Sequence, residues 1–198
     1  FRFFLKDFQD IKKVSNYWIA AQDRINLYND GLTFMKTHSA LCTLENNSFT
    51  NKINTKAVIY VVRDPRNLIT SISHHYSLDT ERAYNFIVNE QKIISQSESG
   101  GEDFGIATVL GSWSEHYKSW QNLKFAPILV IKYEDLIKDT KNTFISILNF
   151  LSTLMDIEIE EKKIINTVHS CSFEKLAEKE KTEGFFEAAT SKKNLKKL

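Results

Sequence analysis

Residues 56–71 read KAVIYVVRDPRNLITS and join a short apolar segment to a stretch of mixed polarity. The segment from Ala57 to Val62 is apolar on both alternating faces, which predicts a strand buried in a parallel sheet. Arg63 follows at the carboxyl end of this strand, where open α/β sheets bind their ligands. Pro65 suits the first turn of a helix, because its missing N–H would have no partner there. We therefore expect a strand at 57–62 and a helix at about 66–77.

A phosphate site is predicted at the start of this helix. Ser71 follows Arg63 by eight residues and lies away from the apolar helix face that includes Ile69. An arginine and a serine beside a strand end are typical ligands of a phosphate group. Two other interpretations stay open: Arg63 could form a structural ion pair with Asp64 or with a carboxylate on a neighbouring strand, and Ser71 could be an ordinary helix residue.

The rest of the chain alternates in the same way. The patterns predict strands at 32–36 and 127–133, a polar irregular segment at 40–55, and helices near 80–95, 110–120, 144–151 and 157–168. Strands separated by helical stretches of more than ten residues indicate βαβ units. The predicted fold class is α/β, with a parallel central sheet flanked by helices. The whole chain, 1–198, is expected to be a single domain.

Polar groups lie at the end of each of the three predicted strands. They are the Lys36-Thr37-His38 segment, Arg63, and the Tyr133-Glu134-Asp135 segment. Because parallel strands end at one edge of a sheet, we expect these clusters to meet in one cleft. A lysine and a histidine beside a phosphate anchor suit group transfer, since they can neutralise charge and accept a proton. Glu134 and Asp135 are adjacent, so they are predicted to serve helix entry and ion pairing rather than acid–base chemistry.

Composition narrows the classes of protein. The 26 basic and 25 acidic residues nearly balance, which argues against general binding to nucleic acid. Two cysteines, Cys42 and Cys171, indicate a reducing compartment, so a cytoplasmic location is expected. No His or Cys cluster has zinc spacing, and no apolar run approaches the roughly 20 residues of a membrane span. We expect neither a bound metal nor a membrane partner.

Six ordered segments between about residues 30 and 176 carry a resemblance to a known family. They are Lys36-Thr37-His38, Val62-Arg63-Asp64-Pro65 with Ser71, Gly111-Ser112-Trp113 with His116, Ser119 and Trp120, Lys132-Tyr133-Glu134-Asp135-Leu136, residues 144–151, and Cys171-Ser172-Phe173-Glu174. Together they resemble the cytosolic sulfotransferases that use 3′-phosphoadenosine-5′-phosphosulfate (PAPS). The resemblance implies a fold like that of P-loop NTPases and transfer of a sulfuryl group to a hydroxyl or amine of a small-molecule acceptor.

The resemblance also implies residue roles. His38 would be the general base and Lys36 would stabilise charge on the departing phosphate oxygen. The nucleotide, PAPS or its product PAP, would be bound by residues of three segments: Arg63 with Ser71, Tyr133, and Cys171 with Ser172 and Phe173. Cys171 stands where the family usually has threonine, and Ser172 alone could be only a helix N-cap. His75 and Tyr76 are candidates for acceptor binding.

Two family segments do not occur in these 198 residues. One is the Pro-Lys-x-Gly-x-x-Trp loop that cradles the 5′-phosphosulfate, and the other is an Arg-Lys-Gly segment that grips the 3′-phosphate. We expect the domain to be incomplete at both ends and the isolated chain to show little or no turnover. Two alternatives remain: a P-loop-type nucleotide or small-molecule kinase, and a non-catalytic nucleotide-binding domain. The acceptor would be selected by residues 40–55 and 76–105, whose sequence names no particular compound.

Overall fold

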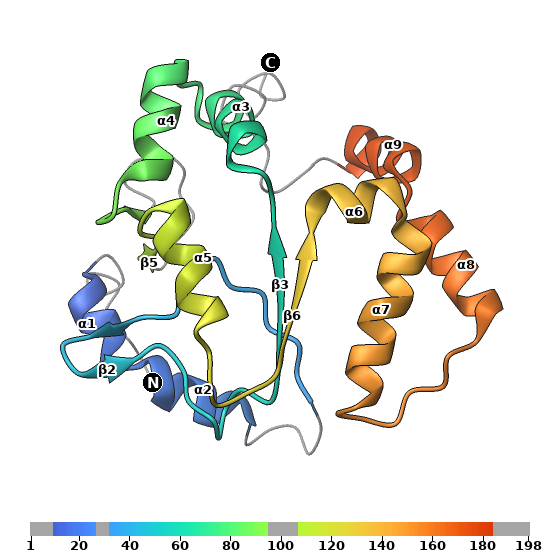
Figure 1. Cartoon of the computed structure of the whole chain (residues 1–198), viewed down its shortest axis with the longest axis horizontal. Coiled ribbons are helices and arrows are strands. Elements are labelled where there is room, and N and C mark those ends of the chain that lie inside the picture. The colour runs from blue at the N-terminus through green and yellow to red at the C-terminus, as the bar shows by residue number, and fades with distance from the viewer. Residues whose placement is uncertain (1–9, 27–31, 95–106, 184–198) are drawn as a thin grey trace. The chain divides into compact units, whose positions relative to one another are not determined.

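The computed structural model describes residues 10–26, 32–94 and 107–183 (Figure 1). The chain divides into two compact units. The first comprises Phe1–Val58 and Leu78–Ile128, and the second comprises Ile59–Ser77 and Leu129–Leu198. None of the helices within the described ranges is long and apolar enough to cross a bilayer. Residues 95–105, which are part of the 76–105 segment expected to select the acceptor, lie outside these ranges.

The strand predicted at 57–62 is present. β3 (Val58–Val62) pairs with β6 (Ile128–Lys132), and the two strands lie side by side and point in the same direction (Figure 1). β3 is followed by α3 (Pro65–Tyr76) and β6 by α6 (Tyr133–Lys138). Pro65 occupies the first turn of α3, as predicted, and the Asp64 side chain caps the helix by accepting the Arg66 amide. The predicted parallel α/β arrangement is confirmed.

The strand pair is less buried than the apolar pattern predicts. Ile131 is 5% exposed, whereas Val61 in β3 is 51% exposed. A strand is covered on both faces only when other strands and helices pack around it. Among the described residues the ladder contains β3 and β6 alone, so the prediction of a fully buried strand is wrong here.

Up to residue 183, where the described part of the chain ends, four helices follow β6 in the second unit. After α6 come α7 (Thr140–Ser152), α8 (Glu161–Ser170) and α9 (Phe173–Glu183), and each helix packs against the next. The Asp139 side chain caps α7 by accepting the Asn142 amide at 3.1 Å. Ile164 of α8 is 5% exposed and anchors the helix. The helices predicted at 144–151 and 157–168 are confirmed with shifted ends.

The first unit begins with two helices and a hairpin. α1 (Ile11–Ser15) and α2 (Trp18–Asn26) precede β1 (Thr43–Leu44) and β2 (Asn47–Ser48), which pair antiparallel. The two-residue turn has positive φ at Glu45 (48°) and Asn46 (67°), which suits the twist of a tight hairpin. The prediction of an irregular segment throughout 40–55 is therefore wrong.

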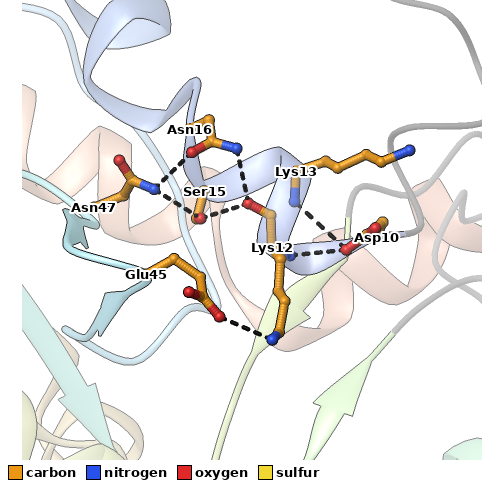
Figure 2. A network of polar contacts seen from close by, with 7 residues as sticks. All are labelled: Asp10, Lys12, Lys13, Ser15, Asn16, Glu45 and Asn47. Atoms are coloured by element: carbon orange, nitrogen blue, oxygen red, sulfur yellow. Dashed lines mark hydrogen bonds and ion pairs between the residues drawn. The ribbon is translucent and has the colours of Figure 1, made fainter.

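Polar contacts join this hairpin to α1 (Figure 2). Lys12 Nζ lies 2.8 Å from Glu45 Oε1 at the turn. On the next strand, Asn47 Nδ2 donates to Asn16 Oδ1 at 2.8 Å and to the buried Ser15 Oγ at 3.3 Å. These side chains fix the hairpin against the helix end.

The core of the first unit combines residues of α1 and α2 with residues from the rest of the unit. α4 (Thr80–Val88) packs against α5 (Trp113–Gln121), and β4 (Ile93–Ile94) pairs antiparallel with β5 (Thr108–Val109). The buried apolar residues here are Val14, Ala40, Ala83, Ile87, Ala107, Trp120 and Leu123. Trp120 meets Phe49 edge-on at 6.2 Å between ring centroids, and Phe49 meets Trp18 at 5.3 Å. The helices predicted near 80–95 and 110–120 are present, although the first ends at Val88.

The strand predicted at 32–36 is not formed. None of the described ladders includes this segment, and Phe34 and Met35 are 67% and 66% exposed. Alternating apolar residues suit a strand, but a strand also needs a neighbour to complete its backbone hydrogen bonds. The local pattern could not supply that neighbour.

Candidate functional site

The segment that carries Lys36 and His38 lies in the first unit. Both side chains are exposed, whereas the next two residues, Ser39 and Ala40, are buried. The Ser39 amide donates to Thr37 Oγ1 at 3.0 Å, and the Ala40 amide donates to the Val109 carbonyl at 2.7 Å. The exposed pair is thus attached to backbone that is anchored immediately after it.

Three side chains of α5 provide much of this anchoring. His116 Nε2 donates to the His38 carbonyl at 3.1 Å, Ser119 Oγ accepts the Leu41 amide at 3.0 Å, and Trp120 Nε1 donates to the Ser39 carbonyl at 3.0 Å. The spacing of three and four residues puts the three side chains on one face of the helix. Since Ser112 caps the helix through the Glu115 amide at 3.2 Å, the position of the face is itself fixed.

His116 is held as a hydrogen-bond donor. Burial lowers the pKa of its imidazole, and the bond to the His38 carbonyl only partly opposes that effect. A neutral imidazole whose Nε2 donates carries its proton on that nitrogen, which defines the tautomer. The histidine therefore serves as a neutral support for the backbone at His38.

In the second unit, Arg63 and Tyr133 meet at the carboxyl ends of β3 and β6. The guanidinium carbon of Arg63 lies 4.7 Å from the centroid of the Tyr133 ring. Both residues are half-buried, and Arg63 Nε is enclosed by protein. A cation over an aromatic face at this distance is attracted by the ring quadrupole. The predicted gathering of polar groups at this strand edge is present for these two residues.

The following residues of the two strands also meet. The Asp64 amide donates to Glu134 Oε1 at 3.1 Å, and this bond is the main reason that the pKa of Glu134 is lowered. The Asp64 carboxylate accepts from the Arg66 amide at 2.9 Å and from Arg66 Nε at 3.0 Å. The Asp64 carboxylate is therefore paired with Arg66. The interpretation of Arg63 as a structural ion-pair partner stays open.

The other candidates on α3 lie along the helix. Ser71 and His75 are exposed, and Tyr76 is half-buried. The rings of His75 and Tyr76 contact each other edge-on, with centroids 4.7 Å apart. These positions leave Ser71 and His75 accessible to a ligand, and their predicted roles stay predictions.

The Cys171-Ser172-Phe173 segment joins α8 to α9. Cys171 is exposed at the end of α8, and Phe173 is 82% exposed at the start of α9. Ser172 Oγ accepts the Lys175 amide at 3.4 Å, which is the contact of an N-cap. The N-cap role left open for Ser172 is thus present, and the exposed Phe173 ring is available for stacking.

The candidates therefore fall into two groups. Lys36 and His38 belong to the first unit, whereas Arg63, Ser71, His75, Tyr76, Tyr133 and the 171–173 segment belong to the second. Within the second unit the structure brings Arg63 and Tyr133 into contact. The single cleft expected from the three strand ends stays a prediction.

Sequence reasoning did not assign the supporting roles of His116 and Glu134. For His116, the spacing of His116, Ser119 and Trp120 was a usable signal, because residues three and four apart lie on one face of a helix. For Glu134, helix entry was predicted and is confirmed by α6, but its contact with the Asp64 amide depends on strand pairing.

Comparison with known proteins gives consistent results. The protein-family model that describes the sulfotransferase domain matches residues 14–194 of this chain. The chain is 30% identical to rat sulfotransferase 1A1 over 149 residues, which are 73% of this chain and 45% of the rat protein. It is 29% identical to guinea pig 3-alpha-hydroxysteroid sulfotransferase over 119 residues (60% and 38%) and 27% identical to rabbit amine sulfotransferase over 127 residues (63% and 38%). The matched residues thus span less than half the length of these relatives.

Proposed function

The chain belongs to the sulfotransferase family, and on that premise we propose that the protein transfers a sulfuryl group from PAPS to a small-molecule acceptor. Membership confirms the resemblance found in the sequence and implies the P-loop-like α/β fold, with which the parallel pair of β3 and β6 agrees. The use of PAPS as donor, the class of acceptor and the roles of individual residues are proposed.

One observation carries the proposal: the Arg63 guanidinium lies over Tyr133 at the carboxyl ends of β3 and β6. Guanidinium groups bind phosphate through paired N–H donors, and ligands of α/β folds bind at this strand edge. The site therefore fits the 3′-phosphate of the nucleotide, with Ser71 on α3 as a second ligand. Tyr133, Cys171, Ser172 and the exposed Phe173 are proposed to contact the rest of the nucleotide.

His38 and Lys36 are proposed to carry the chemistry. An imidazole nitrogen of His38 would take the proton from the acceptor hydroxyl or amine as that group attacks. Lys36 would place its ammonium beside the oxygen on which negative charge develops. PAPS supplies the sulfuryl group when bound. The hydrogen bonds from side chains of α5 to the backbone of residues 38–41 would hold His38 in a fixed position.

The acceptor belongs to a broad class. Two of the relatives are named for a hydroxysteroid and for amines. Their names support testing both hydroxysteroids and amines as acceptors. His75 and Tyr76 on α3 are the proposed acceptor contacts. The proposal also takes residues 1–198 as one domain, supported by the continuous match from 14 to 194, and a cytoplasmic location, supported by the low cysteine content.

The test is a sulfuryl-transfer assay with PAPS on the full-length protein that contains this chain. Phenol, hydroxysteroid and amine acceptors are compared, and the PAP formed is measured. We expect His38→Ala to lower the rate by roughly 10²- to 10⁴-fold, the usual loss of a general base. The control is His169→Ala, which removes another exposed imidazole, at the end of α8. A His38→Ala rate within a few fold of wild type would refute the assigned mechanism.

The same samples address the alternatives. Phosphoryl transfer from ATP without sulfuryl transfer would support a kinase. Saturable PAP binding without transfer to any acceptor would support a non-catalytic nucleotide-binding domain. Measuring the 198-residue chain beside the full-length protein tests the expectation that the chain alone turns over little substrate.

A further inference from the structure

Two consecutive residues after β6 contact two consecutive residues after β3. Tyr133 lies under the guanidinium of Arg63, and Glu134 accepts the amide of Asp64. The first contact is made by a side chain to a side chain, and the second by a side chain to backbone. Both contacts involve the short link between β3 and α3 (Figure 1). This link contains Arg63, the predicted ligand of the phosphate group.

Each contact restricts a different part of Arg63. The arginine side chain has several rotatable bonds and loses much conformational freedom when it binds a ligand. The Tyr133 ring at 4.7 Å favours orientations in which the guanidinium plane stays over the ring face. The 3.1 Å bond to Glu134 restricts the peptide that connects Arg63 to Asp64, and so restricts the direction in which the side chain leaves the backbone.

We propose that Tyr133 and Glu134 are positioning residues that preorganise Arg63 for the phosphate of the nucleotide. The inference rests on the proposed function and adds to it the way in which the phosphate ligand is held. Preorganisation strengthens binding because less freedom is lost when the ligand arrives. Tyr133 therefore acts through its ring face, independently of any contact between its hydroxyl and the nucleotide.

Electrostatics makes the role of Glu134 informative. A carboxylate close to an anion site repels the ligand, so charge alone predicts that removing Glu134 strengthens nucleotide binding. Positioning predicts the opposite, because the Asp64 amide loses its acceptor. Asp135 offers a matched control, since it is also an exposed acid in the first turn of α6.

The binding test is a calorimetric titration of PAP into the full-length protein, with Arg63→Ala as the reference for a lost phosphate ligand. We expect Tyr133→Phe to bind PAP more tightly than Tyr133→Leu, because phenylalanine keeps the ring face beneath the Arg63 guanidinium. We expect Tyr133→Leu to bind roughly 5- to 20-fold more weakly than wild type, since the cation–π contact is lost. Equal losses in the Phe and Leu variants would assign the effect to the hydroxyl and overturn the positioning role.

The second pair of variants separates position from charge. Glu134→Ala is expected to weaken PAP binding about 3- to 10-fold relative to Asp135→Ala, the range of one hydrogen bond. Glu134→Gln keeps an acceptor oxygen and is expected to recover most of the loss. If Glu134→Ala binds PAP as tightly as Asp135→Ala, Glu134 has no positioning role.

A readout without ligand makes the result independent of the proposed function, and the remaining resonances of the spectrum report whether each variant is folded. In a ¹H–¹⁵N spectrum, the Arg63 Nε–H resonance is expected to carry a ring-current shift in wild type and Tyr133→Phe, and to lose it in Tyr133→Leu. A retained shift in Tyr133→Leu would overturn the inference alone. No PAP binding by the folded wild type would instead overturn the proposed function, and with it the purpose assigned to the contact.

Discussion

His116 Nε2 lies 3.1 Å from the carbonyl oxygen of His38, so a partly buried imidazole supports the backbone of an exposed one. The bond requires a proton on Nε2, because a carbonyl oxygen can only accept. Protonation of the other ring nitrogen would keep the bond but place a charge in a site where burial disfavours it. The protonation state of His116 is therefore linked to the stability of the 38–41 segment.

Stability is expected to fall as the pH drops below about 6.5, the ordinary pKa of histidine. The pKa of His116 is lowered in the folded protein, so the unfolded chain takes up the proton first and unfolding is favoured by acid. One such group contributes at most about 1.4 kcal/mol per pH unit. Urea unfolding at pH 5, 6 and 7 measures the slope.

His116→Gln provides the control for this slope. An amide side chain does not titrate but retains an N–H donor for the His38 carbonyl. We expect the variant to be less dependent on pH between 5 and 7 than wild type. An unchanged slope would mean that other groups produce it.

Trp120→Phe is expected to destabilise the first unit by about 2–4 kcal/mol. The substitution removes the Nε1–H that donates to the Ser39 carbonyl at 3.0 Å and leaves space around a ring that is 4% exposed. Trp113→Phe is the comparison, because Trp113 lies on the same helix but is only half-buried and stacks on Tyr117. Chemical unfolding should show a smaller loss for Trp113, and equal losses would contradict the argument.

The parts of the fold that the sequence predicted well are those specified locally. The apolar run at 57–62 and the position of Pro65 act within a few residues, and β3 and α3 form there. The prediction of a strand at 32–36 was wrong because a strand needs a pairing partner, and that partner is distant in the sequence. The hairpin at 43–48 was missed because Glu45-Asn46 is a less typical turn pair than Asn-Gly.

The candidate site shows the same division. Arg63 and Tyr133 were each found because a polar residue follows an apolar run. Their contact depends on the pairing of β3 with β6, which brings together residues 70 positions apart. Neither segment by itself predicts this pairing. The contact between Glu134 and the Asp64 amide depends on the same pairing, so a sequence pattern could suggest the residue but not its partner.

Ser112→Ala is expected to cost about 1 kcal/mol, the usual effect of losing an N-cap. Ser112 is 7% exposed, and its hydroxyl accepts the Glu115 amide at the start of α5. Ser114→Ala is the matched control, because Ser114 is an exposed residue within the same helix and alanine is a good helix former. Urea unfolding should leave Ser114→Ala within about 0.5 kcal/mol of wild type. Equal effects of the two substitutions would argue against the cap.

The Asp64 carboxyl is expected to titrate with a pKa of about 2, chiefly because Arg66 donates side-chain hydrogen bonds to it. Since an unfolded aspartate titrates near 3.9, the unfolded chain binds the proton first as the pH falls. The stabilisation from this contact is therefore complete above about pH 4 and is lost as the pH approaches 2. Carbon-13 NMR of the carboxyl group measures the titration directly.

Arg66→Ala should raise the Asp64 pKa without restoring the ordinary value, because the Arg66 backbone amide still donates to the carboxylate at 2.9 Å. Arg82→Ala is the matched control, since Arg82 makes the corresponding contact with the capping residue Asp79 of α4. It should leave the titration of Asp64 unchanged. An Asp64 pKa near 4 in wild type, or one that does not respond to Arg66→Ala, would show that the carboxylate is not held by the side chain of this arginine.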